Sequence, residues 1–367
     1  MSLKRTVFYD HHLASGGKMV DFGGWELPIQ YTKMREEHLN VRSKAGLFDV
    51  SHMGEVFLEG EGALEAARFL VTNDLNIGNG QAQYTCICNF EGGIVDDVIV
   101  YCFSPDKVMF CINAANREKD SSWIEQNNPS PKVVVRRASE DYAQVAIQGP
   151  LAEQILQKVC DQELSSIAYY AFSTGTVGGI EDCIIARTGY TGEDGFEVFI
   201  PKSNAQKAKD LWGLLLSEGQ EEGIVPVGLG ARDSLRLEAK MNLYGSDMDD
   251  DIKPYEAGLG WTVKMKKFDF IGKKALEAFK SDKWNQRQVS LVLDKKIPRH
   301  GFDVFNADER VGEVTSGGYS PVLGKGIALA RVDRQYAKKG TVLQVQIRGK
   351  KHNATVISGA FYKRDQK

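Results

Sequence analysis

Two adjacent carboxylates, Asp96 and Asp97, interrupt a run that otherwise has the composition of a buried strand. A glycine turn signal at residues 91–93 separates two apolar runs, so residues 84–102 are predicted to form a β-hairpin. Alternation along a strand sends the two carboxylates to opposite faces and puts Asp97 on the face of Tyr101. Either these aspartates serve a turn and a solvated sheet edge, or one is a desolvated carboxylate. Removing a carboxylate from water costs free energy unless the charge is paired. A desolvated Asp97 would therefore be suited to bind or polarise a protonated nitrogen.

Two more charged residues stand out further along the chain. Glu197 lies within an apolar strand pattern at residues 196–200, where it needs either a cationic partner or a ligand. As a ligand group, its two oxygens could accept paired N–H donors from a guanidine-like heterocycle edge. Tyr190, on the turn just before, would supply a stacking face and a hydroxyl. Arg232, near the start of a predicted helix at 229–239, either forms an ion pair within that helix or anchors an anionic ligand group.

Length and composition narrow the function class. A chain of 367 residues is expected to form two or three domains, and 42% hydrophobic with 26% charged residues is typical of a soluble globular protein. The net charge of -3 and the lack of a basic block argue against nucleic acid as a partner. No apolar stretch is long enough for a membrane span, and the N-terminus lacks the apolar core of a signal peptide, so a cytoplasmic location is expected.

The cysteines and histidines do not indicate a metal site. The six cysteines are scattered through apolar contexts, so buried free thiols are a better interpretation than a disulfide framework or a zinc site. The six histidines never fall at metal-ligand spacing. Residues 247–258 resemble a calcium loop but have Ile252 and Gly258 where Gly and Glu are required. No metal is therefore predicted. Residues 228–233 lack the third glycine of a dinucleotide fingerprint, so no dinucleotide site is predicted either.

The pattern of elements changes along the chain. A helix is predicted at 32–45, ended by Gly46, and the chain up to about residue 260 mixes helices with short strands. Residues 262–284 have the composition of a linker with a short helix. Beyond residue 284 only short apolar runs separated by turns remain, which predicts a small all-β barrel or sandwich.

Several segments together resemble the T protein of the glycine cleavage system, the aminomethyltransferase family. The resemblance covers essentially the whole chain in the right order, which is more specific than any single motif. Its clearest segments are residues 21–28, 45–54, 92–97, 187–197, 230–238 and 254–261.

The resemblance implies an α+β fold, a three-domain cloverleaf with folate bound in a central hole. Two of the domains would be mixed α/β domains, the first of them discontinuous, and the third an all-β barrel. The implied boundaries are 1–52 with 140–260 for the first domain, 53–139 for the second, 261–284 for a linker and short helix, and 285–367 for the barrel.

The resemblance also implies a transferase of glycine catabolism and one-carbon metabolism. It would take the aminomethyl group from the dihydrolipoyl arm of the H protein and transfer the one-carbon unit to tetrahydrofolate, giving 5,10-methylenetetrahydrofolate and ammonia. The alternative is another folate-binding member of the same fold, a one-carbon demethylase or a non-enzymatic folate-binding protein. By position, the essential carboxylate falls on Asp97, and the tail residues Tyr362, Lys363 and Arg364 correspond to a segment near the lipoyl entrance. Substrate contacts fall on Tyr190, Glu197, Arg232, Met53, Tyr84, Tyr101, Trp261 and Cys111. At position 111 most of the family has an aliphatic residue instead of cysteine.

Overall fold

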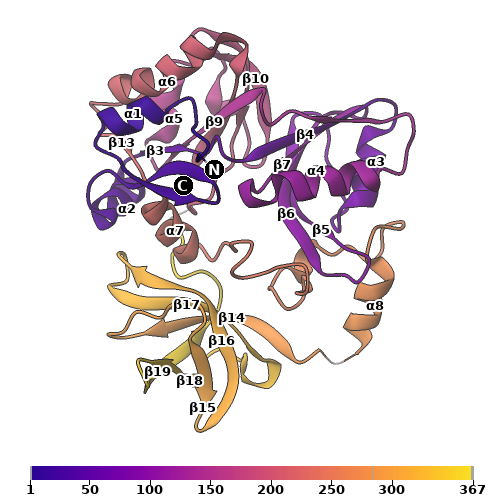
Figure 1. The fold of residues 1–367 in the computed structure, drawn as a ribbon, viewed down its shortest axis with the longest axis vertical. Helices are drawn as coiled ribbons and strands as arrows, with labels where there is room; N and C mark the ends of the chain where they lie inside the picture. The colour runs from indigo at the N-terminus through magenta and orange to yellow at the C-terminus, as the bar shows by residue number, and fades with distance from the viewer. Residues whose placement is uncertain (1, 283, 365–367) are drawn as a thin grey trace. The chain divides into compact units, whose positions relative to one another are not determined.

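The computed structural model describes residues 2–282 and 284–364. The chain divides into two compact units. The first comprises residues 1–66, 75–83 and 99–233, and the second comprises residues 67–74, 84–98 and 234–367. The α+β class and the C-terminal all-β barrel are confirmed (Figure 1). The three-domain boundaries given above stay a prediction.

A six-stranded sheet forms the main core of the first unit, in the order β10-β11-β12-β9-β3-β13. Helices α5 and α6 lie together beside it (Figure 1), and α6 contributes Leu211, Trp212 and Leu215 to the apolar cluster under the sheet. The strands are β3 (Gly46–Asp49), β9 (Tyr142–Gln148), β10 (Phe172–Val177), β11 (Ile180–Ala186), β12 (Gly195–Pro201) and β13 (Val225–Pro226). The helices and the small hairpin of this region are α1 (Tyr9–Ala14), β1 (Lys18–Phe22), β2 (Trp25–Gln30), α2 (Met34–Ser43), α5 (Ala152–Gln157) and α6 (Ala205–Glu218).

The predicted helix at 32–45 is present as α2, but Gly46 does not end it. Gly46 is the first residue of β3, and a Cβ atom there would lie 2.5 Å from Val227 and 2.6 Å from Val41. The glycine is therefore required by close packing, a constraint that acts between segments distant in sequence.

The predicted carboxylate hairpin is confirmed as β5 and β6, neighbours in a five-stranded sheet of order β5-β6-β7-β4-β8. Within the second unit, the turn packs against the chain near Asp250. A Cβ atom on Gly93 would lie 1.6 Å from the Asp250 carbonyl oxygen, so only glycine fits there. The elements of this region are β4 (Gly54–Glu59), α3 (Ala63–Leu70), β5 (Gln81–Cys88), β6 (Ile94–Ser104), β7 (Lys107–Ile112), α4 (Arg117–Gln126) and β8 (Val134–Arg137).

The C-terminal strands close into a barrel in the order β14-β17-β16-β15-β18-β19, so the barrel rather than the sandwich alternative is correct. Inward-facing side chains such as Leu291, Val314 and Leu343 fill it. Among the described residues, no helix is both long and apolar enough to cross a membrane. The remaining elements are α7 (Leu229–Glu238), α8 (Lys273–Ser281), β14 (Gln286–Leu293), β15 (Asp303–Asn306), β16 (Glu309–Ser320), β17 (Lys325–Asp333), β18 (Val342–Ile347) and β19 (Lys350–Ile357).

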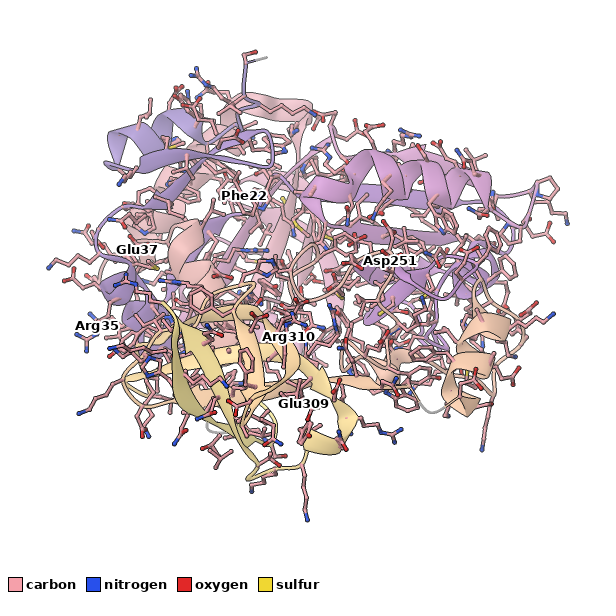
Figure 2. All side chains as sticks on the ribbon, turned by 60° about the horizontal axis from the view of Figure 1, so that its bottom comes forward. Phe22, Arg35, Glu37, Asp251, Glu309 and Arg310 are labelled. Carbon is pink, nitrogen blue, oxygen red and sulfur yellow. The ribbon has the colours of Figure 1, made fainter. Side chains whose placement is uncertain are left out.

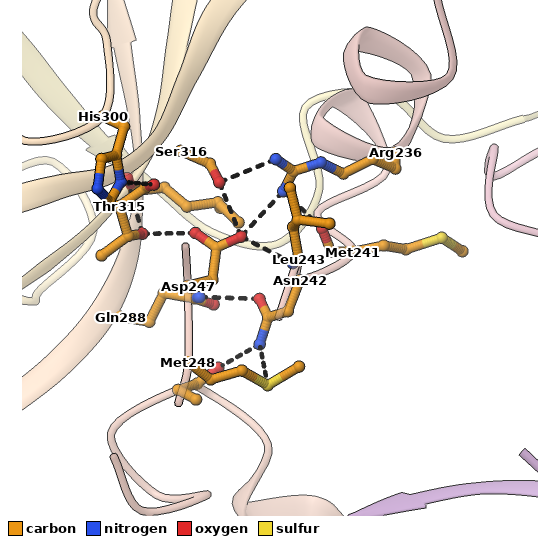
Figure 3. Close-up of polar contacts among 12 residues, drawn as sticks. Arg236, Met241, Asn242, Leu243, Asp247, Met248, Gln288, His300, Thr315 and Ser316 are labelled. Carbon is orange, nitrogen blue, oxygen red and sulfur yellow. Dashed lines mark hydrogen bonds and ion pairs between the residues drawn. The ribbon is translucent and has the colours of Figure 1, made fainter. Parts of the chain in front are cut away.

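A buried ion pair connects the end of α7 to the barrel within the second unit (Figure 3). Arg236 Nη1 lies 2.9 Å from Asp247 Oδ2, and both side chains are almost fully buried. The hydroxyls of Thr315 and Ser316 donate to the same carboxylate at 2.6 and 2.8 Å, and Arg236 Nη2 donates to Ser316 at 2.9 Å. A buried pair is tolerated when such additional hydrogen bonds satisfy it. The carboxylates of the calcium-like segment thus include one that serves the packing of the barrel.

The described part of the C-terminal tail is also tied to α7. The backbone N–H groups of Phe361 and Tyr362 both donate to the Glu238 carbonyl oxygen at 2.9 Å. The Glu238 carboxylate accepts a hydrogen bond from Ser320 at the end of β16. The position of Tyr362 is therefore fixed by the last turn of a helix rather than by the barrel alone.

Candidate functional site

Glu197 is the centre of a polar cluster in the first unit. It lies on β12, in the interior of the six-stranded sheet, with Ala186 and Ala146 as its neighbours on either side. Its Oε2 accepts a 2.6 Å hydrogen bond from the Thr188 hydroxyl, and its Oε1 accepts one from Gln144 Nε2 at 3.4 Å. Burial raises the pKa of Glu197, while the Thr188 hydrogen bond and the charge of Arg232 act in the opposite direction. Glu197 is therefore an acceptor whose charge depends on its neighbours.

The side chain of Gln148, which is 1% exposed, forms hydrogen bonds with the turn between β11 and β12. Gln148 Nε2 donates to the Thr188 carbonyl at 3.0 Å, and its Oε1 accepts from the Thr191 hydroxyl at 2.9 Å. A Cβ atom on Gly189 would lie 1.9 Å from Gln148 Oε1, so the turn needs glycine at that position. This packing fixes the backbone on both sides of Tyr190.

Tyr190 and Arg232, two of the predicted contact residues, lie next to each other. The Arg232 guanidinium carbon lies 4.5 Å from the Tyr190 ring centroid, a cation–π distance. Both belong to the first unit, and Arg232 is half-buried. We call Glu197, Thr188, Gln144, Tyr190 and Arg232 the Glu197 cluster.

Glu37 of α2, labelled in Figure 2, anchors the start of α7, which carries Arg232. Glu37 is 1% exposed, and its Oε2 accepts the Gly228 N–H at 2.9 Å. Its Oε1 accepts the N–H groups of Tyr31 and Thr32 at 2.7 and 2.8 Å. A Cβ atom on Gly228 would lie 2.5 Å from the Ile29 carbonyl group. The glycines that resemble a dinucleotide fingerprint therefore have a packing reason.

Three other predicted contact residues share one apolar cluster in the first unit. Tyr101 is 0% exposed and packs edge-on against Phe172 and Phe199 at 5.5 Å. Cys111 is a buried member of the cluster, and Met53 packs against it. Cys111 thus occupies an apolar position, as the aliphatic residue usual in the family would.

The second unit holds the other predicted residues. The Tyr84 hydroxyl donates to Asp97 Oδ2 at 2.8 Å, and the Tyr84 ring stacks on Trp261 with centroids 5.7 Å apart and planes 21° apart. Trp261 lies on a short 3₁₀ turn (Gly260–Thr262) and is 57% exposed. We call Asp97, Tyr84 and Trp261 the Asp97 cluster.

The two adjacent aspartates differ in burial, and the more buried one is Asp96 rather than Asp97, which the sequence favours as the desolvated carboxylate. Asp96 is 0% exposed, whereas Asp97 is half-buried. Val95 and Val98, their neighbours along the strand, are both 2% exposed. Asp97 therefore combines a hydrogen bond from Tyr84 with partial access to solvent.

Three polar residues of the first unit were not predicted from the sequence. Thr188 and Gln144 contact Glu197 directly, and Gln148 holds the turn. Glutamine side chains on an apolar strand, at 144 and 148, are the signal that could have indicated a buried polar network. His52 is also buried, and its Nδ1 has no hydrogen-bond partner among the described residues.

Burial and the nearby guanidinium groups of Arg232 and Arg117 lower the pKa of His52 to about 3, while Asp49 acts in the opposite direction. The ring meets Phe22 edge-on at 5.6 Å. His52 is therefore a neutral imidazole at physiological pH. Within residues 2–282 and 284–364, no group of three or more His, Cys, Asp or Glu side chains is arranged to hold a metal ion.

Two family models match the chain: the GCVT N-terminal domain over residues 8–267, and the glycine cleavage T-protein C-terminal barrel domain over residues 286–363. The aminomethyltransferase of Desulfitobacterium hafniense is 46% identical over 364 residues, covering 99% of each chain. That of Lysinibacillus sphaericus is 43% identical over 366 residues, with the same coverage. The crystal structure of glycine cleavage system aminomethyltransferase T from Bartonella henselae matches with a TM-score of 0.91 at 32% identity, covering 99% of each chain. The chain belongs to the glycine cleavage T-protein family.

Proposed function

We propose that the chain is the aminomethyltransferase of a glycine cleavage system, with tetrahydrofolate as the one-carbon acceptor and the lipoylated H protein as the donor. The observation that carries this proposal is the match to aminomethyltransferases over 99% of the chain. The hydrogen-bonded carboxylates Asp97 and Glu197 support it, because each has a chemical task in this reaction.

The reaction balances without an oxidant or reductant. The donor carries an S–CH₂–NH₂ group, whose C–S and C–N bonds break while two new C–N bonds form to N5 and N10 of tetrahydrofolate. The two protons lost from those nitrogens leave on the dihydrolipoyl thiol and on ammonia. The one-carbon unit carries cationic, iminium-like character as ammonia departs, so the site needs a negative charge near it.

Asp97 is the residue that we assign to that charge. Its carboxylate is half-buried and accepts a hydrogen bond from the neutral Tyr84 hydroxyl, which orients it. A carboxylate held in this way stabilises developing positive charge and can accept an N–H of the reacting folate nitrogen.

Glu197, Tyr190 and Arg232 are assigned to substrate binding. The paired oxygens of Glu197 suit the adjacent N–H donors of a pterin ring, a bidentate arrangement that combines strength with geometry. The Tyr190 ring, with Arg232 4.5 Å from its centroid, offers a stacking face next to a cation for an anionic substrate group. Tyr84, Tyr101, Trp261, Met53 and Cys111 are assigned to the lining of the substrate site.

Turnover with a defined donor tests the proposal. The purified chain is mixed with H protein whose arm carries the aminomethyl group, with and without tetrahydrofolate, and ammonia and methylenetetrahydrofolate are measured. We expect the two products in equal amounts and in a tetrahydrofolate-dependent manner. Ammonia release at the same rate without tetrahydrofolate would contradict the proposal. The absence of any turnover would also contradict it and would leave a non-enzymatic folate-binding protein as the alternative.

Thermal unfolding gives an independent check. Tetrahydrofolate at a hundredfold excess over its dissociation constant should stabilise the folded state by about 2.7 kcal/mol through linkage. NAD and ATP serve as controls and should produce no shift, because residues 228–233 lack the third glycine of a dinucleotide fingerprint and Gly228 packs closely on Ile29. A comparable shift with either nucleotide would argue for a different ligand.

A further inference from the structure

Thr188 connects the half-buried Glu197 and the buried Tyr101 of the first unit. Its hydroxyl donates to Glu197 Oε2 at 2.6 Å and lies 3.5 Å from the Tyr101 hydroxyl. Thr188 is 2% exposed and Tyr101 is 0% exposed, so bulk water does not compete for these contacts. The three groups form a hydrogen-bond chain that ends on the carboxylate assigned to the pterin ring.

The direction of this chain follows from its chemistry. Burial, followed by the neighbouring Glu197 and Cys111, raises the pKa of Tyr101 well above its usual value, so the phenol keeps its proton. The Thr188 hydroxyl has a single hydrogen, which it donates to Glu197. Tyr101 therefore donates to Thr188, and Thr188 donates to Glu197.

The hydroxyl cannot move away easily. The Thr188 carbonyl accepts a hydrogen bond from Gln148 at 3.0 Å, and Gly189 packs directly on the Gln148 side chain. Thr191 holds the other end of the same amide at 2.9 Å. The backbone at Thr188 is thus fixed from below, and its hydroxyl is aimed at one oxygen of Glu197.

We propose that Thr188 is a positioning residue, which orients the Glu197 carboxylate as an acceptor of the paired N–H donors of the substrate. This inference rests on the proposed function, because it takes the pterin ring as the ligand of Glu197. Thr188 occupies one lone pair of Oε2, and the carboxylate retains further acceptor positions for two parallel N–H donors. A protonated Glu197 would present a donor to one of them and lose that match.

The groups that set the charge of Glu197 are few in the described structure. Burial raises the pKa of Glu197; the Thr188 hydrogen bond lowers it, as does the charge of Arg232 on α7. Tyr101 of β6 and Gln144 of β9 also face it, the first as a neutral phenol and the second as an amide. Removing the Thr188 hydroxyl takes away a contact that stabilises the charged form, so the pKa of Glu197 should rise. As pH falls, Glu197 of the variant would then become protonated before that of the wild type.

The pH dependence of tetrahydrofolate binding tests the inference. Affinity for tetrahydrofolate is measured by calorimetry from pH 5 to pH 9 for the wild type, Thr188→Val and Thr188→Ser. We expect Thr188→Val to bind about tenfold more weakly at neutral pH, with the difference widening as pH falls. Thr188→Ser keeps the hydroxyl and should follow the wild-type profile.

Two further variants distinguish positioning from a general effect on the turn. Tyr101→Phe preserves the buried ring and removes only the first donor of the chain, so a smaller shift in the same direction is expected. Thr191→Val disturbs the same turn without touching Glu197, so any loss of affinity should be independent of pH. A constant difference between Thr188→Val and the wild type at every pH, or a failure of Thr188→Ser to restore the profile, would overturn the inference. Absence of binding to the wild type would instead overturn the proposed function.

Discussion

The Glu197 cluster and the Asp97 cluster both present a carboxylate on a β-strand, but they support it in different ways. Glu197 lies in the interior of a six-stranded sheet, and its hydroxyl donor Thr188 is 2% exposed. A guanidinium, that of Arg232, acts on its charge. Asp97 receives its hydrogen bond from a half-buried phenol, and that phenol stacks on Trp261, which is 57% exposed.

This difference suggests a division of labour between binding and chemistry. A carboxylate fixed by buried polar groups on a rigid turn offers one geometry, which suits recognition of a planar ring edge. A half-buried carboxylate oriented by a phenol hydroxyl suits stabilisation of a developing cation. The contrast predicts that substitutions in the two clusters affect different kinetic constants.

The largest effect is expected for Asp97→Asn, which keeps the shape and removes the charge. Loss of electrostatic stabilisation is commonly worth about 3 kcal/mol or more, so kcat should fall at least a hundredfold. The dissociation constant of tetrahydrofolate, measured by calorimetry, should change little. Asp96→Asn is the matched control, and its main effect should be a lower free energy of unfolding. Equal loss of turnover in both variants, or full turnover in Asp97→Asn, would remove Asp97 from the chemistry.

Glu197→Gln should show the opposite pattern, a loss in binding. Replacing one acceptor oxygen by a donor should weaken tetrahydrofolate binding by on the order of 1–3 kcal/mol. The exposed Glu181 of β11 provides a control, since Glu181→Gln should leave the affinity unchanged. Unchanged affinity in Glu197→Gln with an intact fold would place the pterin ring elsewhere.

His52 should make the free energy of unfolding depend on pH. Its pKa of about 3 in the folded state lies below the ordinary value near 6.5, so the unfolded chain binds the extra proton first as pH falls. Stability is therefore unaffected by this group above pH 6.5 and is lost below it, by about 2 kcal/mol between pH 7 and pH 5. Urea unfolding of the wild type and of His52→Leu at pH 7 and pH 5 measures this loss. The free energy of unfolding should fall less between the two pH values in the variant than in the wild type. Parallel losses would show that other groups cause the acid sensitivity.

The smallest effect is expected for Tyr84→Phe, which keeps the stack on Trp261 and removes the donor to Asp97. A single hydrogen bond to an oriented carboxylate is worth about 1 kcal/mol, so kcat should fall roughly fivefold with little change in KM for tetrahydrofolate. Tyr319→Phe, at a tyrosine that is 40% exposed on the barrel, is the control and should be neutral. A larger change in KM than in kcat would show that the Tyr84 hydroxyl acts in substrate binding and not through Asp97.

Much of the fold could be predicted from local patterns. The hairpin around residues 91–93, the strand alternation that separates Asp96 from Asp97, and the all-strand region beyond residue 284 were all predicted from the sequence and are present. Such patterns are visible because turn residues and side-chain alternation act over a few neighbouring positions. The interpretation of Gly46 as the end of a helix was wrong, because local patterns do not include distant contacts. Val227, which excludes a side chain at position 46, is far away in sequence.

The sequence by itself determined which residues are candidates for the chemistry: a carboxylate at 97, a carboxylate at 197 and an arginine at 232, each in a context where a charge needs a partner. Only the tertiary structure decided what surrounds them. Thr188, Gln144 and Gln148 are ordinary polar residues in the sequence and become a buried network only when β9, β11 and β12 pair. Hydrogen bonds of this kind join residues brought together by folding, so no local pattern encodes them, and yet Thr188 and Gln144 both donate to Glu197.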